Sequence, residues 1–190
     1  FNQPWYIGDT IPVGIGQGFW STTPIQLSQS VNTLVNRGER IIPQIIRGFM
    51  HEDSSVEIIP LKTLRPIEIK NQHNVDIVLN AMHDVVHGKE GGARHTFADA
   101  SYQSAGKTGT AQLFSVGQDE KYDAEKIDER LRDNAMYVGF APFENPEISV
   151  TVVLENAGGG SKNAAPVAKK IMDFYFRDRV FDTEISKVDE

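Results

Sequence analysis

The sequence contains no cysteine among its 190 residues. Disulfide bonds, thiol catalysis and cysteine-ligated zinc are therefore excluded for this chain. Its longest apolar runs fall far short of the roughly 18–20 residues that a membrane helix needs. Basic residues are scarce, with 19 lysines and arginines against 26 acidic residues, and they form no cluster. This balance excludes nucleic acid as a partner, because phosphate backbones require concentrated positive charge.

The remaining composition is typical of a folded soluble domain. Apolar residues make up 39% of the chain and charged residues 24%, with a net charge of -7. Such a chain has enough apolar surface to form a core, so wholesale disorder is excluded. The first residue is Phe1 rather than methionine, and we expect a processed chain or an excised part of a longer protein.

Three segments have the pattern of helices. The first begins after Thr23, where Pro24 suits the first helical position, and ends at Gly38. The second covers an apolar repeat from Val75 to Val86 and ends at Gly88. The last begins near residues 163–166. The apolar side chains expected to form its buried face are Val167, Ile171, Phe174 and Tyr175.

Three later segments have the pattern of strands. They are Ala105–Phe114, Ala135–Pro142 and Ile148–Glu155. The last two flank a turn at residues 144–147, which predicts an antiparallel hairpin. Because strands cluster after helices, the sequence predicts an α+β fold with an antiparallel sheet flanked by helices. Short extended pieces around a turn at residues 51–55 are expected in Ile41–Pro60.

Other segments are expected to lie outside the core. Phe1–Trp20 has the composition of a loop, and its Gly14–Gly18 stretch has the wrong spacing for a nucleotide-binding loop. Residues 115–134 contain a dense mixture of charges and are expected to be a solvated insertion. Residues 178–190 are expected to be a frayed tail.

Two features allow a ligand-binding and a plain structural interpretation. His83 and His87 are one helical turn apart, a spacing that suits zinc, but no third ligand or HExxH motif accompanies them. We therefore expect two solvent-side histidines near the negative end of a helix dipole and no metal site. The glycine-rich stretch at residues 158–161 precedes a helix but lacks the Walker pattern for phosphate.

The stretch from Lys107 to Thr110 has the residues for binding an extended peptide. On a strand, Lys107 and Gly109 share one face, and Thr108 and Thr110 share the other. A glycine permits close approach to the backbone, and an edge strand can pair with a peptide. Lysine and threonine side chains can bind a terminal carboxylate. A chance Lys-Thr-Gly-Thr in an ordinary edge strand is the alternative interpretation.

The motif and its surroundings resemble class B penicillin-binding proteins. Residues 104–112, Ser-Ala-Gly-Lys-Thr-Gly-Thr-Ala-Gln, resemble the third signature of that family. The segments that resemble the family in the same order are residues 14–18, 23–27, 91–94, 138–142, 152–156 and 164–167. Within the class, residues 8–13 and 126–133 are most similar to the penicillin-binding protein 2 group, the transpeptidases of side-wall elongation.

This resemblance implies a fold, a reaction and partners. It places residues 1–190 in the C-terminal portion of one transpeptidase domain, with three of the five strands of the penicillin-binding protein and serine β-lactamase fold. The implied reaction is peptidoglycan D,D-transpeptidation through a serine acyl-enzyme, without a cofactor. The implied partners are the peptidoglycan stem peptide, β-lactam antibiotics, the remainder of the transpeptidase domain and the cell-wall elongation machinery. The implied location is the periplasmic side of the bacterial inner membrane.

The resemblance also implies roles for single residues. Lys107 would supply positive potential, and the backbone N–H of Thr110 would be half of the oxyanion hole, so both are candidate catalytic residues. Thr108, Gly109 and Gln112, with the Thr110 hydroxyl, would bind substrate. The last strand would pair with a strand from earlier in the full domain, and this chain alone would leave that edge open.

The nucleophile that the family uses is absent from this sequence. The family carries it in a Ser-x-x-Lys motif, and the one serine of this chain with lysine three residues later is Ser104. Its lysine is Lys107 of the strand motif, and residues three apart on a strand point to opposite faces, so these two do not form the nucleophile pair. We therefore expect the segment to be inactive alone. The alternatives are a β-lactam-sensing or β-lactamase domain, or a non-catalytic module that binds peptides with the same strand.

Overall fold

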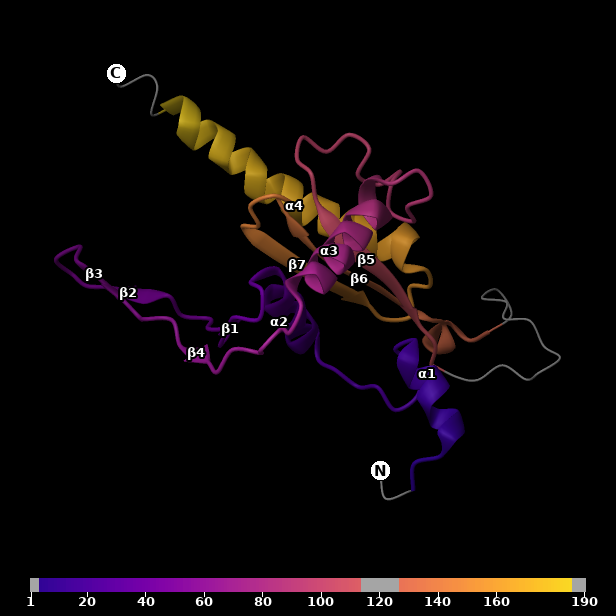
Figure 1. Ribbon diagram of the computed structural model, residues 1–190. Coiled ribbons are helices and arrows are strands. Elements are labelled where there is room, and N and C mark those ends of the chain that lie inside the picture. Colours follow the sequence, from indigo (N-terminus) through magenta and orange to yellow (C-terminus); the bar gives the residue numbers. More distant parts are fainter. Residues whose placement is uncertain (1–3, 114–126, 186–190) are drawn as a thin grey trace.

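The computed structural model describes residues 4–113 and 127–185, and its main body is a three-stranded sheet between helices (Figure 1). The predicted α+β class is confirmed. In chain order the elements are η1 (Ile7–Asp9), α1 (Thr10–Gly14), α2 (Pro24–Val35), β1 (Arg40–Ile41), β2 (Gly48–Met50), β3 (Val56–Ile58), β4 (Thr63–Leu64), α3 (Gln72–His87), β5 (Ala105–Ala111), η2 (Glu129–Leu131), β6 (Asn134–Ala141), β7 (Ile148–Leu154) and α4 (Gly160–Ile185).

The sheet has the order β5-β6-β7 and is antiparallel throughout. Its register is continuous, with Lys107 opposite Val138 and Tyr137 opposite Val152. All three predicted strands and the β6–β7 hairpin are confirmed. Strand β5 ends at Ala111, earlier than expected, so Gln112 lies one residue beyond it.

Two apolar clusters lie on opposite faces of this sheet because side chains alternate along each strand. Tyr137 and Val152 point into a cluster with α4. Val138 and Phe140 point into a second cluster with α2 and α3. The sheet is therefore a layer between helices, and both faces of its central strand are buried.

Helix α4 buries a different face from the one predicted. Val167, Ile171 and Phe174 are 36%, 43% and 60% exposed. The side chains that face the sheet are Ala164, Ala165, Ala168 and Met172, all fully buried. The prediction was wrong because it followed the larger side chains, whereas alanines let the helix approach the sheet closely.

Helices α2 and α3 were predicted correctly. In α2, the Thr23 hydroxyl accepts from the Gln26 N–H, and the Gln26 side chain accepts from the Thr23 N–H. This reciprocal capping box fixes where the helix begins. Val31 of α2 and Leu79 of α3 are buried in the same cluster, so both helices pack against the sheet.

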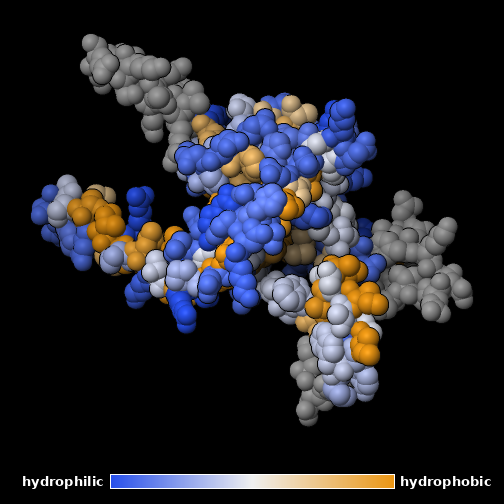
Figure 2. Space-filling model, in the orientation of Figure 1, coloured by the Kyte–Doolittle hydropathy of each residue, from blue (hydrophilic) through white to orange (hydrophobic). Residues whose placement is uncertain are grey.

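The segment between α2 and α3 forms a long arm that projects from the body (Figure 1). Strand β1 pairs with β4, and β2 pairs with β3 around the predicted turn at residues 51–55. Apolar side chains are exposed along this arm, and they appear as orange surface in Figure 2. They include Ile45, Phe49, Met50, Val56 and Ile58.

The N-terminal segment is not wholly a loop, which corrects the expectation for Phe1–Trp20. It contains η1 and α1, and the Asp9 carboxylate accepts from the Tyr6 N–H at 2.9 Å. Local capping of this kind satisfies a free donor at a helix start without any tertiary contact. None of the residues in these two short helices is buried.

Two expectations fall largely outside the described residues. Most of the charged insertion at residues 115–134 lies there, and its described end contains η2. The backbone of α4 is helical through Ile185, past the point where fraying was expected. Residues 186–190 lie outside the described part, so the frayed tail at 178–190 stays a prediction.

Candidate functional site

Strand β5 is an edge strand in the described part of the chain. It pairs with β6 on one side, and no described strand pairs with its other side. Lys107 and Thr110 are exposed, and Thr108 and Gly109 are partly exposed. Gln112, just past the end of the strand, is also exposed. The candidate residues therefore lie together on an accessible edge, as strand addition by a peptide requires.

The side chains alternate as expected because β5 has no bulge in its pairing with β6. Ala105 points into the α2–α3 cluster, which places Lys107 and Gly109 on that face. Thr108 and Thr110 lie on the opposite face, where the Thr110 hydroxyl is 3.4 Å from the Gly160 N–H of α4. Each face of β5 therefore carries two residues of the Lys107–Thr110 motif.

The backbone of Thr110 points its carbonyl away from β6. The Gln17 side-chain Nε2 donates to this oxygen at 3.2 Å from the glycine-rich segment. In a strand the N–H and C=O of one residue point to the same side. We therefore infer that the Thr110 N–H also points to the open edge, where it can donate to a ligand.

The first turn of α4 lies beside the end of β5. A Cβ atom at Gly160 would meet the carbonyl oxygens of Gly109 and Met136, so only glycine permits this approach. The free N–H groups of a helix N-terminus carry partial positive charge. Because Gly160 is close to Thr110, this charge adds to that of Lys107 near the motif.

A cleft of about 290 Å³ lies along β5. One wall is the motif itself, and the other is the glycine-rich segment with Trp20. Its lining residues are Ile15, Gly16, Gln17, Trp20, Thr22, Leu27, Lys107, Thr108, Gly109, Thr110, Ala111, Met136, Tyr137 and Val138. Lys107 is the one charged residue in this set, so the cleft favours an anionic group over a cation.

The loop between α3 and β5 is fixed to α3 by the two histidines. His87 Nε2 accepts from the Ser104 N–H at 3.0 Å, and His83 Nε2 lies 2.9 Å from Gln103 Oε1. The pKa of His87 is lowered, mainly by burial and also by the nearby His83. The bond from Ser104 acts in the opposite direction and is the smallest of the three effects. The two rings are therefore not simply solvent-side, because the loop returns over the end of α3. In the described part of the chain, no three histidine, aspartate or glutamate side chains lie close enough to hold a metal ion.

The same loop is fixed to α4 by charged groups. Tyr102, 9% exposed, donates to Asp173 at 2.9 Å. Lys169 bonds Asp173 at 2.7 Å and lies 3.2 Å from Asp99. Burial of Tyr102, followed by its bond to Asp173, raises the pKa of its phenol. The loop that leads into β5 is thus attached to helices on both faces of the sheet.

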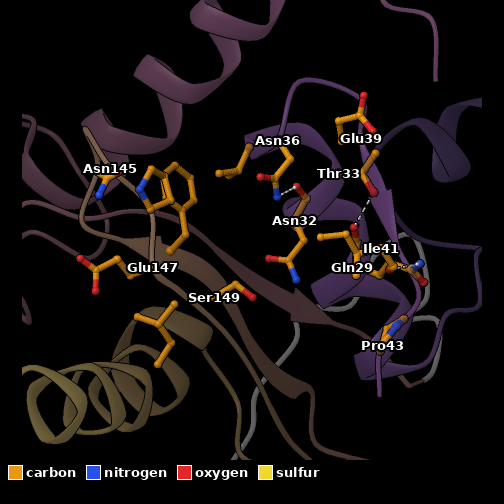
Figure 3. A pocket seen from close by; sticks show the side chains of 14 residues that line it. Gln29, Asn32, Thr33, Asn36, Glu39, Ile41, Pro43, Asn145, Glu147 and Ser149 are labelled. Carbon is orange, nitrogen blue, oxygen red and sulfur yellow. Dashed lines mark hydrogen bonds between the residues drawn. The ribbon is translucent and has the colours of Figure 1, made fainter. Parts of the chain in front are cut away.

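A second hollow, of about 400 Å³, lies between α2, β1 and the β6–β7 turn (Figure 3). Its polar side chains are largely engaged within the chain. Asn36 donates to the Asn32 carbonyl at 2.8 Å, and Gln29 donates to the Ile41 carbonyl at 3.2 Å. The hollow also borders β7, whose outer edge pairs with no described strand. Its lining includes no lysine or arginine and no counterpart of the Lys107–Thr110 motif.

Two participants of the site were missed by the sequence reasoning. Gln17 was treated only as part of a glycine-rich loop, and Gly160 only as part of a rejected phosphate loop. Their positions depend on contacts over 93 and 50 residues of chain. The only available signal was the unusual glycine content of both segments.

The fold and the site define a domain with an antiparallel sheet between helices and an open sheet edge beside a cleft. Residues 2–173 match the Penicillin binding protein transpeptidase domain family. The chain belongs to this family. None of the helices in the described ranges has the length and apolarity needed to cross a bilayer.

Curated relatives agree with this assignment. The chain is 42% identical to the peptidoglycan D,D-transpeptidase MrdA of Haemophilus influenzae, over 97% of this chain and 28% of that protein. It is 39% identical to the MrdA of Escherichia coli K12, over 84% of this chain and 25% of that protein. The chain therefore spans about a quarter of the length of these relatives.

Solved structures resemble the whole described body. Pseudomonas aeruginosa PBP2, in complex with WCK 5153, is 39% identical with a TM-score of 0.72, over 91% of this chain and 34% of that one. The Helicobacter pylori PBP2 from a complex with MreC is 27% identical with a TM-score of 0.69. This match covers 92% of this chain and 28% of that one. The predicted family and its fold are thus confirmed.

Proposed function

We propose that this chain is part of a peptidoglycan D,D-transpeptidase and supplies the strand that binds the stem peptide. The observation that carries the proposal is the open edge of β5, where Lys107 and Thr110 are exposed beside a cleft. An extended peptide ending in a carboxylate fits this edge, because the backbone offers hydrogen bonds and the side chains offer charge and hydroxyls.

The chemistry in the parent protein is acyl transfer. A serine outside this chain attacks the carbonyl between two D-alanines, the terminal D-alanine leaves, and an amine of a second stem peptide attacks the acyl-enzyme. β-Lactams acylate the same serine. This chain contributes electrostatic stabilisation and positioning, not the nucleophile.

The Thr110 N–H is the proposed oxyanion donor on this chain. It is supported by the direction of the Thr110 carbonyl, which accepts from Gln17 at the open edge. A donor fixed in a strand needs no reorganisation as negative charge develops on the attacked carbonyl oxygen. Removing one such donor typically costs about 2.7–4 kcal/mol of transition-state stabilisation.

The substrate carboxylate has two proposed partners on the α4 face of the motif, the Thr110 hydroxyl and the N-terminus of α4 at Gly160. Lys107, on the other face of β5, supplies positive potential to the cleft. Thr108 and Gly109 complete the binding edge, and Gln112 follows it. Lys107 Nζ donates to the Thr108 carbonyl at 2.8 Å, which holds the lysine alongside the strand.

Replacing Thr110 by valine in the full-length protein tests the proposal. The change removes the hydroxyl and keeps the shape and the backbone N–H. Loss of a hydrogen bond to a charged group predicts about a 10- to 100-fold lower kcat/KM for a D-Ala-D-Ala peptide. The control is Thr151→Val on β7, where the buried hydroxyl has no hydrogen-bond partner among the described residues.

The two variants distinguish the outcomes. Equal activity of Thr110→Val and the unmodified protein would contradict carboxylate binding at Thr110. Equal losses in Thr110→Val and Thr151→Val would indicate damage to the sheet instead. Rapid release of the acyl group after reaction with penicillin would indicate a β-lactamase rather than a transpeptidase.

The relatives support a place for the parent protein in cell-wall synthesis. The Helicobacter pylori relative is solved in a complex with MreC. We extend this association to the parent protein, as a member of the elongation machinery that maintains cell shape. Its substrate lies in the cell wall, so the proposed location is the periplasmic face of the inner membrane.

A further inference from the structure

Gln17 lies at the open edge of β5, where a peptide would pair. Its Nε2 donates to the Thr110 carbonyl at 3.2 Å. Both residues line the cleft, and the contact joins its two walls. No role for Gln17 was predicted, and the proposed reaction does not use it.

Strand β5 does not depend on this contact for its position. Thr110 lies within a continuous ladder, with Gly109 opposite Met136 and Ala111 opposite Asn134. The glycine-rich segment has less support. Gly16 and Gly18 have φ values of +78° and +69°, and a Cβ at Gly16 would meet no atom within 4 Å. The contact therefore positions Gln17 and its segment against the strand.

The acceptor that Gln17 occupies is one that strand addition requires. A peptide paired to the open edge bonds the N–H and C=O of alternate residues, so one peptide N–H donates to the Thr110 carbonyl. The Gln17 amide N–H stands at that acceptor in the absence of a peptide.

We propose that Gln17 competes with the backbone of the incoming peptide for the Thr110 carbonyl and thereby sets the affinity of the cleft for ligands with an N–H at that point. This inference rests on the proposed function. The peptide replaces one neutral amide donor by another, so binding gains little from that hydrogen bond while Gln17 is present. Removing the competitor would recover the net value of one neutral hydrogen bond, roughly a two- to tenfold change in affinity.

The experiment replaces Gln17 by methionine in the full-length protein, which keeps the side-chain length and removes the donor. The matched control is Gln29→Met, because Gln29 also donates Nε2 to a backbone carbonyl, that of Ile41, at 3.2 Å. Steady-state kinetics are measured with a peptide ending in D-Ala-D-Ala. We expect Gln17→Met to raise kcat/KM two- to tenfold, mainly through KM, and Gln29→Met to leave it unchanged.

A set of peptides, each methylated at a different backbone nitrogen, identifies the peptide N–H that competes with Gln17 for the Thr110 carbonyl. For one of them, the gain from Gln17→Met should disappear, because that peptide has no N–H to offer the freed carbonyl. A purely structural role of Gln17 would change all peptides alike. A lower or unchanged kcat/KM in Gln17→Met, or a gain shared by every methylated peptide, would overturn the proposal.

Labelling by fluorescent penicillin separates this inference from the proposed function. If the full-length protein is not labelled covalently, the proposed transpeptidase activity fails. If it is labelled and Gln17→Met behaves as the unmodified protein with peptides, only the role of Gln17 fails.

Discussion

Tyr102 donates its phenolic hydrogen to the Asp173 carboxylate at 2.9 Å, and this bond connects the loop before β5 to helix α4. The Tyr102 ring also packs against Phe176, with ring centroids 4.7 Å apart. Since β5 follows this loop directly, a contact between residues 71 positions apart in the sequence helps to hold the loop that leads into β5.

Tyr102→Phe is expected to lower the stability of the full-length protein. The change removes the hydrogen bond to Asp173 and keeps the ring contact with Phe176. Asp173 is partly exposed, so we expect a loss of about 1.5 kcal/mol, at the lower end for bonds to charged groups. Denaturant unfolding measures the loss. Tyr6→Phe, at a residue 64% exposed, is the control and should unfold as the unmodified protein does.

Gly160→Ala is expected to disturb the start of α4 and the end of β5 together. The new Cβ would meet the carbonyl oxygens of Gly109 and Met136, which belong to paired strands and cannot move separately. Overpacking of this kind typically costs about 1–3 kcal/mol. Acylation of the full-length protein by fluorescent penicillin should fall as well.

Gly159→Ala is the matched control for that change. A Cβ at Gly159 would meet no atom within 4 Å, so the neighbouring substitution should have little effect. Equal acylation rates in the two alanine variants would contradict the close approach of α4 to β5.

The stability of the full-length protein is expected to depend on His87 in mildly acidic solution. Its pKa is lowered from 6.5, so the unfolded chain takes up a proton more readily than the folded one as the pH falls. The contribution of His87 is present above about pH 6.5 and is lost as the pH decreases towards the lowered pKa. Protonation would also end the bond that Nε2 accepts from Ser104.

Thermal unfolding between about pH 5 and pH 7.5 tests this dependence. The charged and titratable neighbours are His83, whose ring is 4.8 Å away, and Asp84, which lies 4.0 Å from His83. His87→Gln should flatten the profile, whereas His73→Gln, at an exposed position of the same helix, should not. A profile that His87→Gln leaves unchanged would refute the assignment.

The isolated chain of 190 residues is expected to react with no penicillin. Its one Ser-x-x-Lys match, Ser104 with Lys107, lies at the start of β5, where Ser104 is fully buried, so the chain has no accessible nucleophile for the proposed reaction. The outer edge of β7 pairs with no described strand, which favours self-association. Covalent labelling of the purified chain by fluorescent penicillin would contradict the first expectation. Monomeric behaviour in sedimentation would contradict the second.

The sequence by itself determined the elements whose signals are local. Helix α2 begins where Thr23 and Gln26 cap each other, and α3 follows its apolar repeat. The three strands of the sheet and the Lys107–Thr110 motif were found in the same way. These patterns are sufficient because helix capping and side-chain alternation depend on residues close together in the chain.

Tertiary structure decided which surfaces meet. The larger apolar side chains of α4 predicted the wrong buried face, because only the sheet shows that small alanines such as Ala168 permit close packing. The contact of Gln17 with Thr110 spans 93 positions, and no local pattern encodes it. Such contacts depend on how whole elements pack, so they follow from the folded arrangement and not from any single segment.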